Sequence, residues 1–206
     1  MKVPGVHELR TLWLRLNQVR RRRRWNRQYA AGEWTWLARP GELARYSVLA
    51  GYALELKPQG KILDVGCGEG LLRDRLHPLA FTQYVGIDFE EPISRAAHRV
   101  DERTRFVAAD MNFFVPDAAF DAIVFNESLY LFRNVAEGLE RYETFLAPHG
   151  TFLISMHGGT KTEEIWTRLA ERYAAIDEVT IINRDGATWT CKALAVQTGP
   201  GSGLSP

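Results

Sequence analysis

A glycine-rich run follows a short apolar segment about a third of the way along the chain. Residues 62–70 read Ile-Leu-Asp-Val-Gly-Cys-Gly-Glu-Gly. Glycine permits a sharp backbone turn and lets a ligand lie against the main chain without obstruction. The spacing is G-x-G-x-G, and Leu71 stands where a dinucleotide fingerprint requires Gly or Ala. The run therefore predicts a ligand-binding turn between a strand and a helix that departs from the dinucleotide pattern.

Three acidic residues accompany this turn. Asp64 stands two residues before the first glycine, Asp88 ends the next apolar segment, and Asp110 follows the third. Because the carboxyl ends of neighbouring strands in a doubly wound sheet surround one crevice, we expect the three carboxylates to meet there. Asp88 is placed to accept hydrogen bonds from ribose hydroxyls, and Asp110 to accept one from an exocyclic amine. Since so many acids would repel a pyrophosphate, the pattern favours a nucleoside over a dinucleotide.

Apolar runs and helical patterns alternate through the middle of the chain. The predicted strands are Lys61–Val65, Tyr84–Ile87, Arg105–Ala109, Ala122–Phe125 and Thr151–Met156. Helical patterns lie at Leu71–His77, Pro92–Arg99 and Val135–Leu146. An earlier helix begins at Pro40 and runs to about Leu56. The alternation predicts a buried, mostly parallel sheet in an α/β protein.

The C-terminal part has a different pattern. A helix is predicted at Thr162–Ala174, and strand-like runs follow at Glu178–Asn183 and Thr188–Gln197. Asp-Gly at positions 185 and 186 is a hairpin signal, so an antiparallel pair is expected to close the sheet.

The order of these motifs resembles the class I S-adenosylmethionine-dependent methyltransferases. The matching motifs are Leu63–Gly70, Gly86–Asp88, Val107–Met111 and Phe120–Leu131, and the similarity covers roughly residues 40–197. The resemblance implies a Rossmann-like, doubly wound α/β fold with a mostly parallel, seven-stranded sheet and a C-terminal antiparallel hairpin. It also implies S-adenosylmethionine as the cofactor.

The resemblance assigns residues to the methionine end of the cofactor. Gly66, Gly68 and Gly70 would lie against the methionine part. Asp64 would bind its amino group, directly or through water. From its position on the helix after Pro40, Tyr46 is a further candidate for the carboxylate of the cofactor.

The nucleoside end is assigned in the same way. Asp88 would take the ribose, and Phe89 would pack on the adenine ring. Asp110 and Met111 would meet the adenine edge. Asn126 lies in the segment that the resemblance places where cofactor and acceptor meet.

Glu127 and His157, which follow the fourth and fifth predicted strands, are the candidate catalytic residues. Methyl transfer from a sulfonium is an in-line displacement with an activated electrophile, so alignment and exclusion of water are the main requirements. A base helps only where the acceptor loses a proton. His157 is the candidate base, with an exposed loop histidine as the alternative. For Glu127 we favour a role in shaping the site.

Aromatic residues before the first strand are candidates for binding the acceptor. Tyr29, Trp34 and Trp36 would line an acceptor pocket, together with Tyr130. The alternative is that they anchor the N-terminal arm to the domain. Glu127 and Ser128 occupy the positions of the prolines in the motif of enzymes that methylate adenine or glutamine nitrogen. We therefore predict a small-molecule acceptor, a sugar or other biosynthetic intermediate, methylated at oxygen.

The arginine run Arg20–Arg24 gives the chain a strong charge asymmetry. Residues 1–27 carry a net charge of +8, and the remainder carries −7. Five consecutive arginines circle a helix, so solvated surface or support of a lid is one interpretation. Attraction to an anionic or lipid-linked acceptor or a membrane is another. We expect no nucleic-acid partner, although RNA or peptide methylation through this arm is an alternative function. A second alternative function is that of a non-catalytic module that binds the cofactor.

Composition limits the remaining possibilities. No apolar run reaches the ~18 residues of a membrane-spanning helix, and the first ten residues lack the order of a secretory signal. The two cysteines do not indicate a disulfide framework, and no His/Cys/Asp cluster indicates a metal. We predict a cytoplasmic protein with an N-terminal arm and acceptor lid at 1–39, a cofactor-binding domain at 40–197 and a disordered tail at 198–206. The oligomeric state is not indicated.

Overall fold

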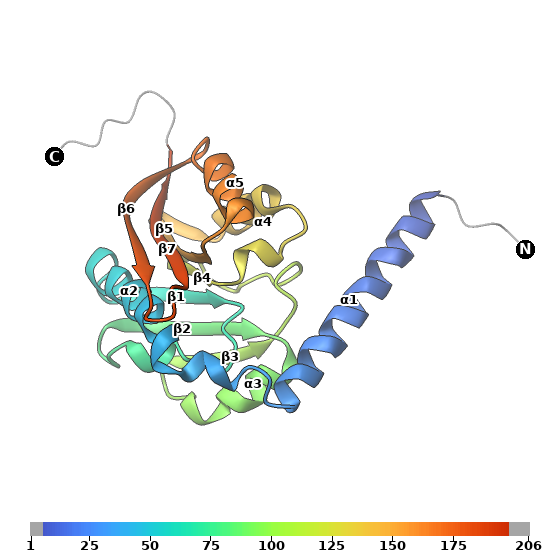
Figure 1. Ribbon diagram of the computed structural model, residues 1–206, viewed down its shortest axis with the longest axis horizontal. Helices are drawn as coiled ribbons and strands as arrows, with labels where there is room; N and C mark the ends of the chain where they lie inside the picture. Colours follow the sequence, from blue (N-terminus) through green and yellow to red (C-terminus); the bar gives the residue numbers. More distant parts are fainter. Residues whose placement is uncertain (1–5, 198–206) are drawn as a thin grey trace, which may run out of the picture.

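The computed structural model describes the backbone of residues 6–197 and the side chains of residues 18–197. Its centre is a seven-stranded sheet in the order β3-β2-β1-β4-β5-β7-β6 (Figure 1). The strands are β1 Gly60–Val65, β2 Phe81–Asp88, β3 Thr104–Ala108, β4 Phe120–Asn126, β5 Leu146–His157, β6 Tyr173–Ile182 and β7 Thr188–Val196. The first five strands pair in parallel, and β7 pairs antiparallel with both β5 and β6. The predicted fold class and C-terminal hairpin are confirmed.

Helices cover both faces of the sheet. They are α1 Val6–Ala30, α2 Pro40–Leu56, α3 Glu90–Ala96, α4 Val135–Glu143 and α5 Thr160–Leu169, with 3₁₀ turns η1 Thr35–Ala38, η2 Arg73–Arg75, η3 Ala97–Arg99 and η4 Leu129–Leu131. Successive side chains of a strand point to opposite faces. Ile62 therefore packs with Leu49 of α2, whereas Leu63 belongs to the apolar cluster that contains Leu139 of α4.

Three predicted helices differ from the structure, and the one predicted over Val135–Leu146 ends at Glu143, since Leu146 begins β5. The segment Leu71–His77 forms only η2; Gly70 before it has a φ of 84°, and His77, the residue before Pro78, is disfavoured in the helical region. The helix predicted over Thr162–Ala174 ends at Leu169. Tyr173 instead opens β6 and pairs with Val196, so sheet pairing prevails over helical propensity there.

Helix α1 extends away from the body of the molecule (Figure 1). Within residues 6–197, no helix combines the length and apolar character that crossing a bilayer requires. The predicted disordered tail at 198–206 lies outside the described residues.

Candidate functional site

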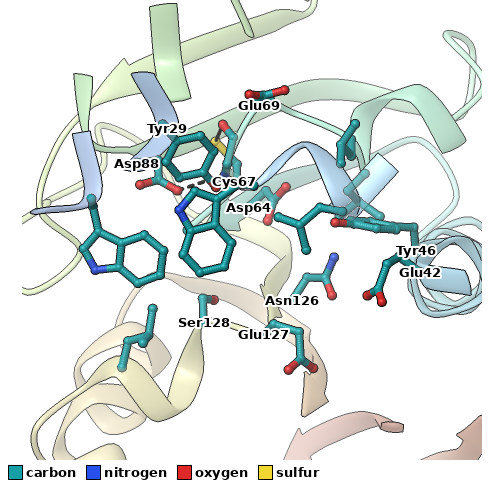
Figure 2. Close-up of a pocket in the computed structure, with 18 of the residues that line it drawn as sticks. Tyr29, Glu42, Tyr46, Asp64, Cys67, Glu69, Asp88, Asn126, Glu127 and Ser128 are labelled. Atoms are coloured by element: carbon teal, nitrogen blue, oxygen red, sulfur yellow. Dashed lines mark hydrogen bonds between the residues drawn. The ribbon is translucent and has the colours of Figure 1, made fainter. Parts of the chain in front are cut away.

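A cavity of about 580 Å³ lies at the carboxyl ends of β1, β2 and β4 (Figure 2). We call the strand ends and the turns that follow them the floor of the cavity. Side chains from α1, η1, the turn between them and β7 line its other side, which we call the roof, and α2 adds Arg45 and Tyr46 to the lining. The floor is the predicted crevice, since parallel strands place their carboxyl ends at one edge of the sheet.

The glycine turn exposes its backbone to the cavity. Gly66 and Gly68 have φ values of 77° and 56°, in the region that favours glycine. A Cβ atom at Gly66 would lie 2.6 Å from Cβ of Ser128, and one at Gly68 would lie 2.9 Å from the Tyr29 hydroxyl. Both glycines line the cavity, whereas Gly70 does not. A Cβ atom at Gly70 would lie 2.8 Å from the Phe106 ring, so this glycine permits packing against β3.

Asp64 is a buried carboxylate with one oxygen free to bind a ligand. It is 1% exposed, and its Oδ2 accepts a 2.5 Å hydrogen bond from the Tyr84 hydroxyl. Its Oδ1 has no partner among the described residues. Burial raises the pKa of Asp64 to about 7. A ligand cation next to Oδ1 would stabilise the charged form.

Asp88 fixes the geometry of the glycine turn. Its Oδ2 accepts a 2.9 Å bond from the Gly68 backbone N–H, and its Oδ1 accepts a 2.7 Å bond from that of Phe89. Burial raises its pKa to about 6. Both Asp88 and the buried Phe89 line the cavity.

The remaining predicted cofactor contacts divide into two groups. Tyr46, Met111 and Asn126 line the cavity. Asp110 does not, and its Oδ1 accepts bonds from the Asn112 backbone N–H at 2.9 Å and from Nδ2 of Asn112 at 2.6 Å. Asp110 thus stabilises the turn after β3.

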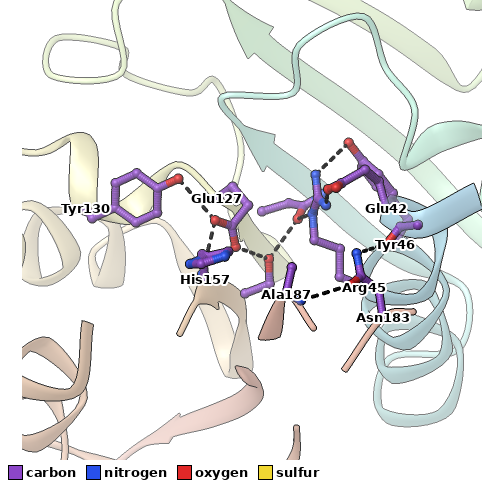
Figure 3. A network of polar contacts seen from close by, with 11 residues as sticks. Glu42, Arg45, Tyr46, Glu127, Tyr130, His157, Asn183 and Ala187 are labelled. Carbon is purple, nitrogen blue, oxygen red and sulfur yellow. Dashed lines mark hydrogen bonds and ion pairs between the residues drawn. The ribbon is translucent and has the colours of Figure 1, made fainter. Parts of the chain in front are cut away.

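Glu127 is the centre of a polar network at the end of β4 (Figure 3). Its φ of 57° is unusual for a residue other than glycine and marks local strain. Oε1 accepts a 3.1 Å bond from the Ser155 hydroxyl, and Oε2 accepts 3.1 Å bonds from the Tyr130 hydroxyl and the His157 backbone N–H. Burial raises the pKa of Glu127. The carboxylate thus connects the ends of β4 and β5.

The imidazole of His157 is exposed and lines the cavity. Its Nδ1 lies 2.8 Å from the Gly158 carbonyl oxygen, and its ring meets the Trp189 ring edge-on at 5.7 Å. A neutral imidazole that donates from Nδ1 keeps a lone pair on Nε2. This arrangement suits a proton acceptor.

Arg45, which no sequence pattern singled out, is 2% exposed and lines the cavity from α2. Its Nε donates to Oδ1 of Asn126 at 3.1 Å, and its Nη2 donates to the Tyr46 hydroxyl at 3.2 Å. It also forms an ion pair with Glu42, and its guanidinium lies 5.5 Å from the centre of the Trp189 ring. The available signal in the sequence was the pair Glu42 and Arg45, an acid and a base three residues apart beside the apolar stripe of α2.

The aromatic side chains of the roof form one stack. The rings of Trp25 and Trp34 lie 4.8 Å apart with an angle of 19°, and Trp34 also contacts Tyr29 at 5.9 Å and Trp36 at 6.1 Å. All four line the cavity, as does Tyr130. Both sequence-based interpretations fit, because these rings anchor the arm and also face the cavity. Trp25 was missed.

Polar contacts hold the C-terminal half of α1 over the body. Nη1 of Arg21 donates to the Leu131 carbonyl at 2.9 Å. Nε of Arg22 and Nδ2 of Asn26 each donate to Oε2 of Glu90 at 2.9 Å. Two members of the arginine run therefore bind the protein itself.

Known proteins with the same fold include two methyltransferases. The N-methyltransferase NodS from Bradyrhizobium japonicum, in complex with S-adenosyl-L-homocysteine, superposes with a TM-score of 0.70 at 21% identity, over 80% of this chain and 92% of that one. The 1,6-didemethyltoxoflavin-N1-methyltransferase of Burkholderia thailandensis, with 1,6-didemethyltoxoflavin and S-adenosylhomocysteine bound, gives 0.72 at 19% identity, over 96% and 93%. At these identities the likeness concerns the fold.

Sequence comparison identifies the family. Uncharacterized methyltransferases of Mycobacterium tuberculosis and Mycobacterium bovis are 33% identical over 96 residues, or 45% of this chain and 48% of theirs. The chain thus spans about half the length of the curated relatives it matches. A family model described as a methyltransferase domain matches residues 20–192. The chain belongs to this family of methyltransferase domains, which confirms the resemblance seen in its motifs.

Proposed function

We propose that the protein binds S-adenosylmethionine on the floor of the cavity and transfers its methyl group to a small-molecule acceptor beneath the roof. The carrying observation is that the side-chain-free backbone of the glycine turn, Asp64 and Asp88 line one cavity. When bound, S-adenosylmethionine supplies an activated methyl group on a sulfonium sulfur.

The residues present fit this cofactor. The ammonium group of its methionine part suits the unpaired Oδ1 of Asp64. The carboxylate suits the cationic Arg45 with the hydroxyl of Tyr46. Asp88 keeps lone pairs for the ribose hydroxyls beyond the two backbone bonds it accepts. Phe89 offers an apolar face for the adenine.

The acceptor side supports a compact, ring-containing acceptor. Tyr29, Trp34 and Trp36 supply flat apolar walls, and a cavity of about 580 Å³ has room for the cofactor and a small molecule. We propose that Nε2 of His157 takes the proton of a hydroxyl acceptor while Glu127 holds the site in shape. The two structural neighbours described above are named as methyltransferases that act at nitrogen. Methylation at oxygen is therefore a more specific part of the proposal and needs a test of its own.

The arm at 1–39 is proposed as the acceptor lid and 40–197 as the catalytic domain. The family model begins at residue 20, within α1. Arg21 and Trp25 of α1 line the cavity, which supports a role for the arm in the site.

The decisive experiment is a calorimetric titration of S-adenosylmethionine, S-adenosylhomocysteine and NAD into the wild type, Asp88→Ala and Asp117→Ala. Asp117 is the matched control, since it pairs with Arg105 away from the cavity. We expect the first two ligands to bind the wild type and the control, with affinity lowered about 100-fold in Asp88→Ala. Preference for NAD, or no binding of either sulfur ligand, would contradict the proposal.

A subsequent acceptor screen, read by mass spectrometry, tests the transfer itself. The NMR chemical shifts of the transferred methyl group distinguish a methyl ether or ester from an N-methyl amine. Methylation of hydroxyl acceptors that is lost in His157→Ala supports the base assignment. If amines are methylated and this activity survives in His157→Ala, the acceptor atom is nitrogen and not oxygen.

A further inference from the structure

The arginine run divides between the two faces of α1. Arg21 lines the cavity and binds the Leu131 carbonyl, and Arg22 pairs with Glu90. Trp25 and Tyr29, four and eight positions after Arg21, also line the cavity. Residues spaced by four in a helix share a face, so this face of α1 is directed toward the body.

The other arginines share the opposite face. They are Arg20, Arg23, Arg24 and Arg27, and we call them the outer stripe. Their spacing of three, four and seven positions places them within one helical face about 10 Å long. All four are exposed, and their side chains form no hydrogen bond or ion pair with residues 18–197. Five consecutive arginines point in all directions around the helix. Because Arg21 and Arg22 contact the protein itself, the arginines that remain free of such contacts within residues 18–197 form a cationic stripe on one face.

The surroundings of the outer stripe indicate an extended anionic surface as its partner. None of its members lines the cavity, so a small ligand has no pocket there. Between residues 20 and 27, the positions on this face hold only arginines, with no aromatic or amide side chain that could contact bases or sugars. Charge without shape or base contacts suits a lipid surface better than a nucleic acid.

The charge of the rest of the chain fixes the orientation. Residues 28–206 carry a net charge of −7, so an anionic surface repels the body and attracts only the arm. Helix α1 projects from the body, which allows its outer face to approach a flat surface (Figure 1).

We infer that the outer stripe docks the protein on anionic lipid bilayers, a surface interaction separate from the proposed methyl transfer. Each arginine near such a surface contributes about 1 kcal/mol, so removal of four is expected to weaken partitioning on the order of 100-fold or more. The attraction is screened by salt within about 10 Å.

The test is co-sedimentation of the full chain with vesicles of phosphatidylcholine alone or with about 30% phosphatidylglycerol. The stripe variant replaces all four arginines by Gln. A matched control replaces the exposed arginines at 39, 75, 168 and 184 by Gln, which removes the same charge elsewhere. We expect binding only to the anionic vesicles, loss in the stripe variant, retention in the control and weakening at about 500 mM salt.

A third variant with Lys at the four stripe positions guards against misfolding, and we expect it to bind vesicles like the wild type. Equal binding to neutral and anionic vesicles, no binding, or equal loss in stripe and control variants would overturn the inference. Tighter binding to a single-stranded RNA oligonucleotide that displaces vesicles would overturn it in favour of a nucleic acid. Calorimetric binding of S-adenosylmethionine by the same variants separates this outcome from failure of the proposed enzyme function.

Discussion

The floor and the roof of the cavity are built in different ways. The floor takes its residues from the ends of adjacent parallel strands, and backbone bonds such as that from the Gly66 N–H to the Ile87 carbonyl at 2.9 Å hold it rigidly. The roof takes its residues from an arm, a 3₁₀ turn and the late strand β7, and it is held by side-chain contacts such as the Trp25–Trp34 stack. A strand-end floor keeps one cofactor geometry, whereas a roof of separate segments can change with the acceptor.

Loss of charge on the floor should have the largest effect on the cofactor. Asp64→Asn keeps a hydrogen-bond acceptor for Tyr84 but removes the charge that we assign to the ammonium group. We expect cofactor affinity to fall about 30- to 100-fold in calorimetry, as is typical when a hydrogen bond to a charged group is lost. Because burial disfavours the Asp64 carboxylate, the ligand-free variant should melt about 2–4 °C above the wild type. A weakly binding variant with lowered Tm would contradict this role.

Loss of the roof should affect the acceptor more than the cofactor. For Trp34→Ala combined with Trp36→Ala, we expect turnover of an identified acceptor to fall about 10-fold or more, because the acceptor loses the walls that align it. Cofactor affinity should change less than about 3-fold. Phe113→Ala is a control, since this aromatic side chain is 61% exposed and does not line the cavity. Equal losses in turnover and cofactor affinity would remove the distinction between floor and roof.

The same distinction explains what the sequence alone could predict. Asp64, Asp88 and the glycine turn were identified because strand–helix alternation places them at one sheet edge. Trp189 was missed because its position depends on β7 lying between β5 and β6, which sets it opposite His157. Arg45 was missed because its partner Asn126 is 81 positions away. Local patterns therefore identified the residues at the strand ends and the aromatic residues of the arm, whereas Trp189 and Arg45 depend on contacts between distant segments.

The pH dependence of cofactor binding should report the protonation of the two carboxylates on the floor. The pKa values of about 7 for Asp64 and about 6 for Asp88 lie above those of an unfolded chain. In the ligand-free protein, the stability that these groups contribute is complete below about pH 4 and is lost as the pH rises through 6 and 7. Because the ammonium group of the ligand requires a charged Asp64, affinity should instead rise over this interval, and a pKa of about 7 gives a loss of about 20-fold between pH 7.5 and 5.5.

Proton release provides the measurement for this prediction. Titrations at pH 6.5 in buffers of different ionisation enthalpy should give different apparent binding enthalpies, because the carboxylates lose protons when the ligand binds. Asp64→Asn should reduce this difference between buffers. Identical enthalpies in all buffers would show that the carboxylates are already charged in the free protein.

The attachment of the arm should give the smallest effect. Glu90 receives bonds from Arg22 and Asn26 of α1, but the Arg22–Glu90 pair is largely exposed, and such pairs contribute about 0–1 kcal/mol. Glu90→Gln should therefore open the C-terminal half of α1 only about 2- to 5-fold more often, seen as faster tryptic cleavage at residues 20–27. Asp117→Asn, which breaks the exposed pair with Arg105, should leave this cleavage unchanged. Cleavage at the wild-type rate in Glu90→Gln would place the attachment in the aromatic stack, and Trp25→Ala would then be expected to accelerate it.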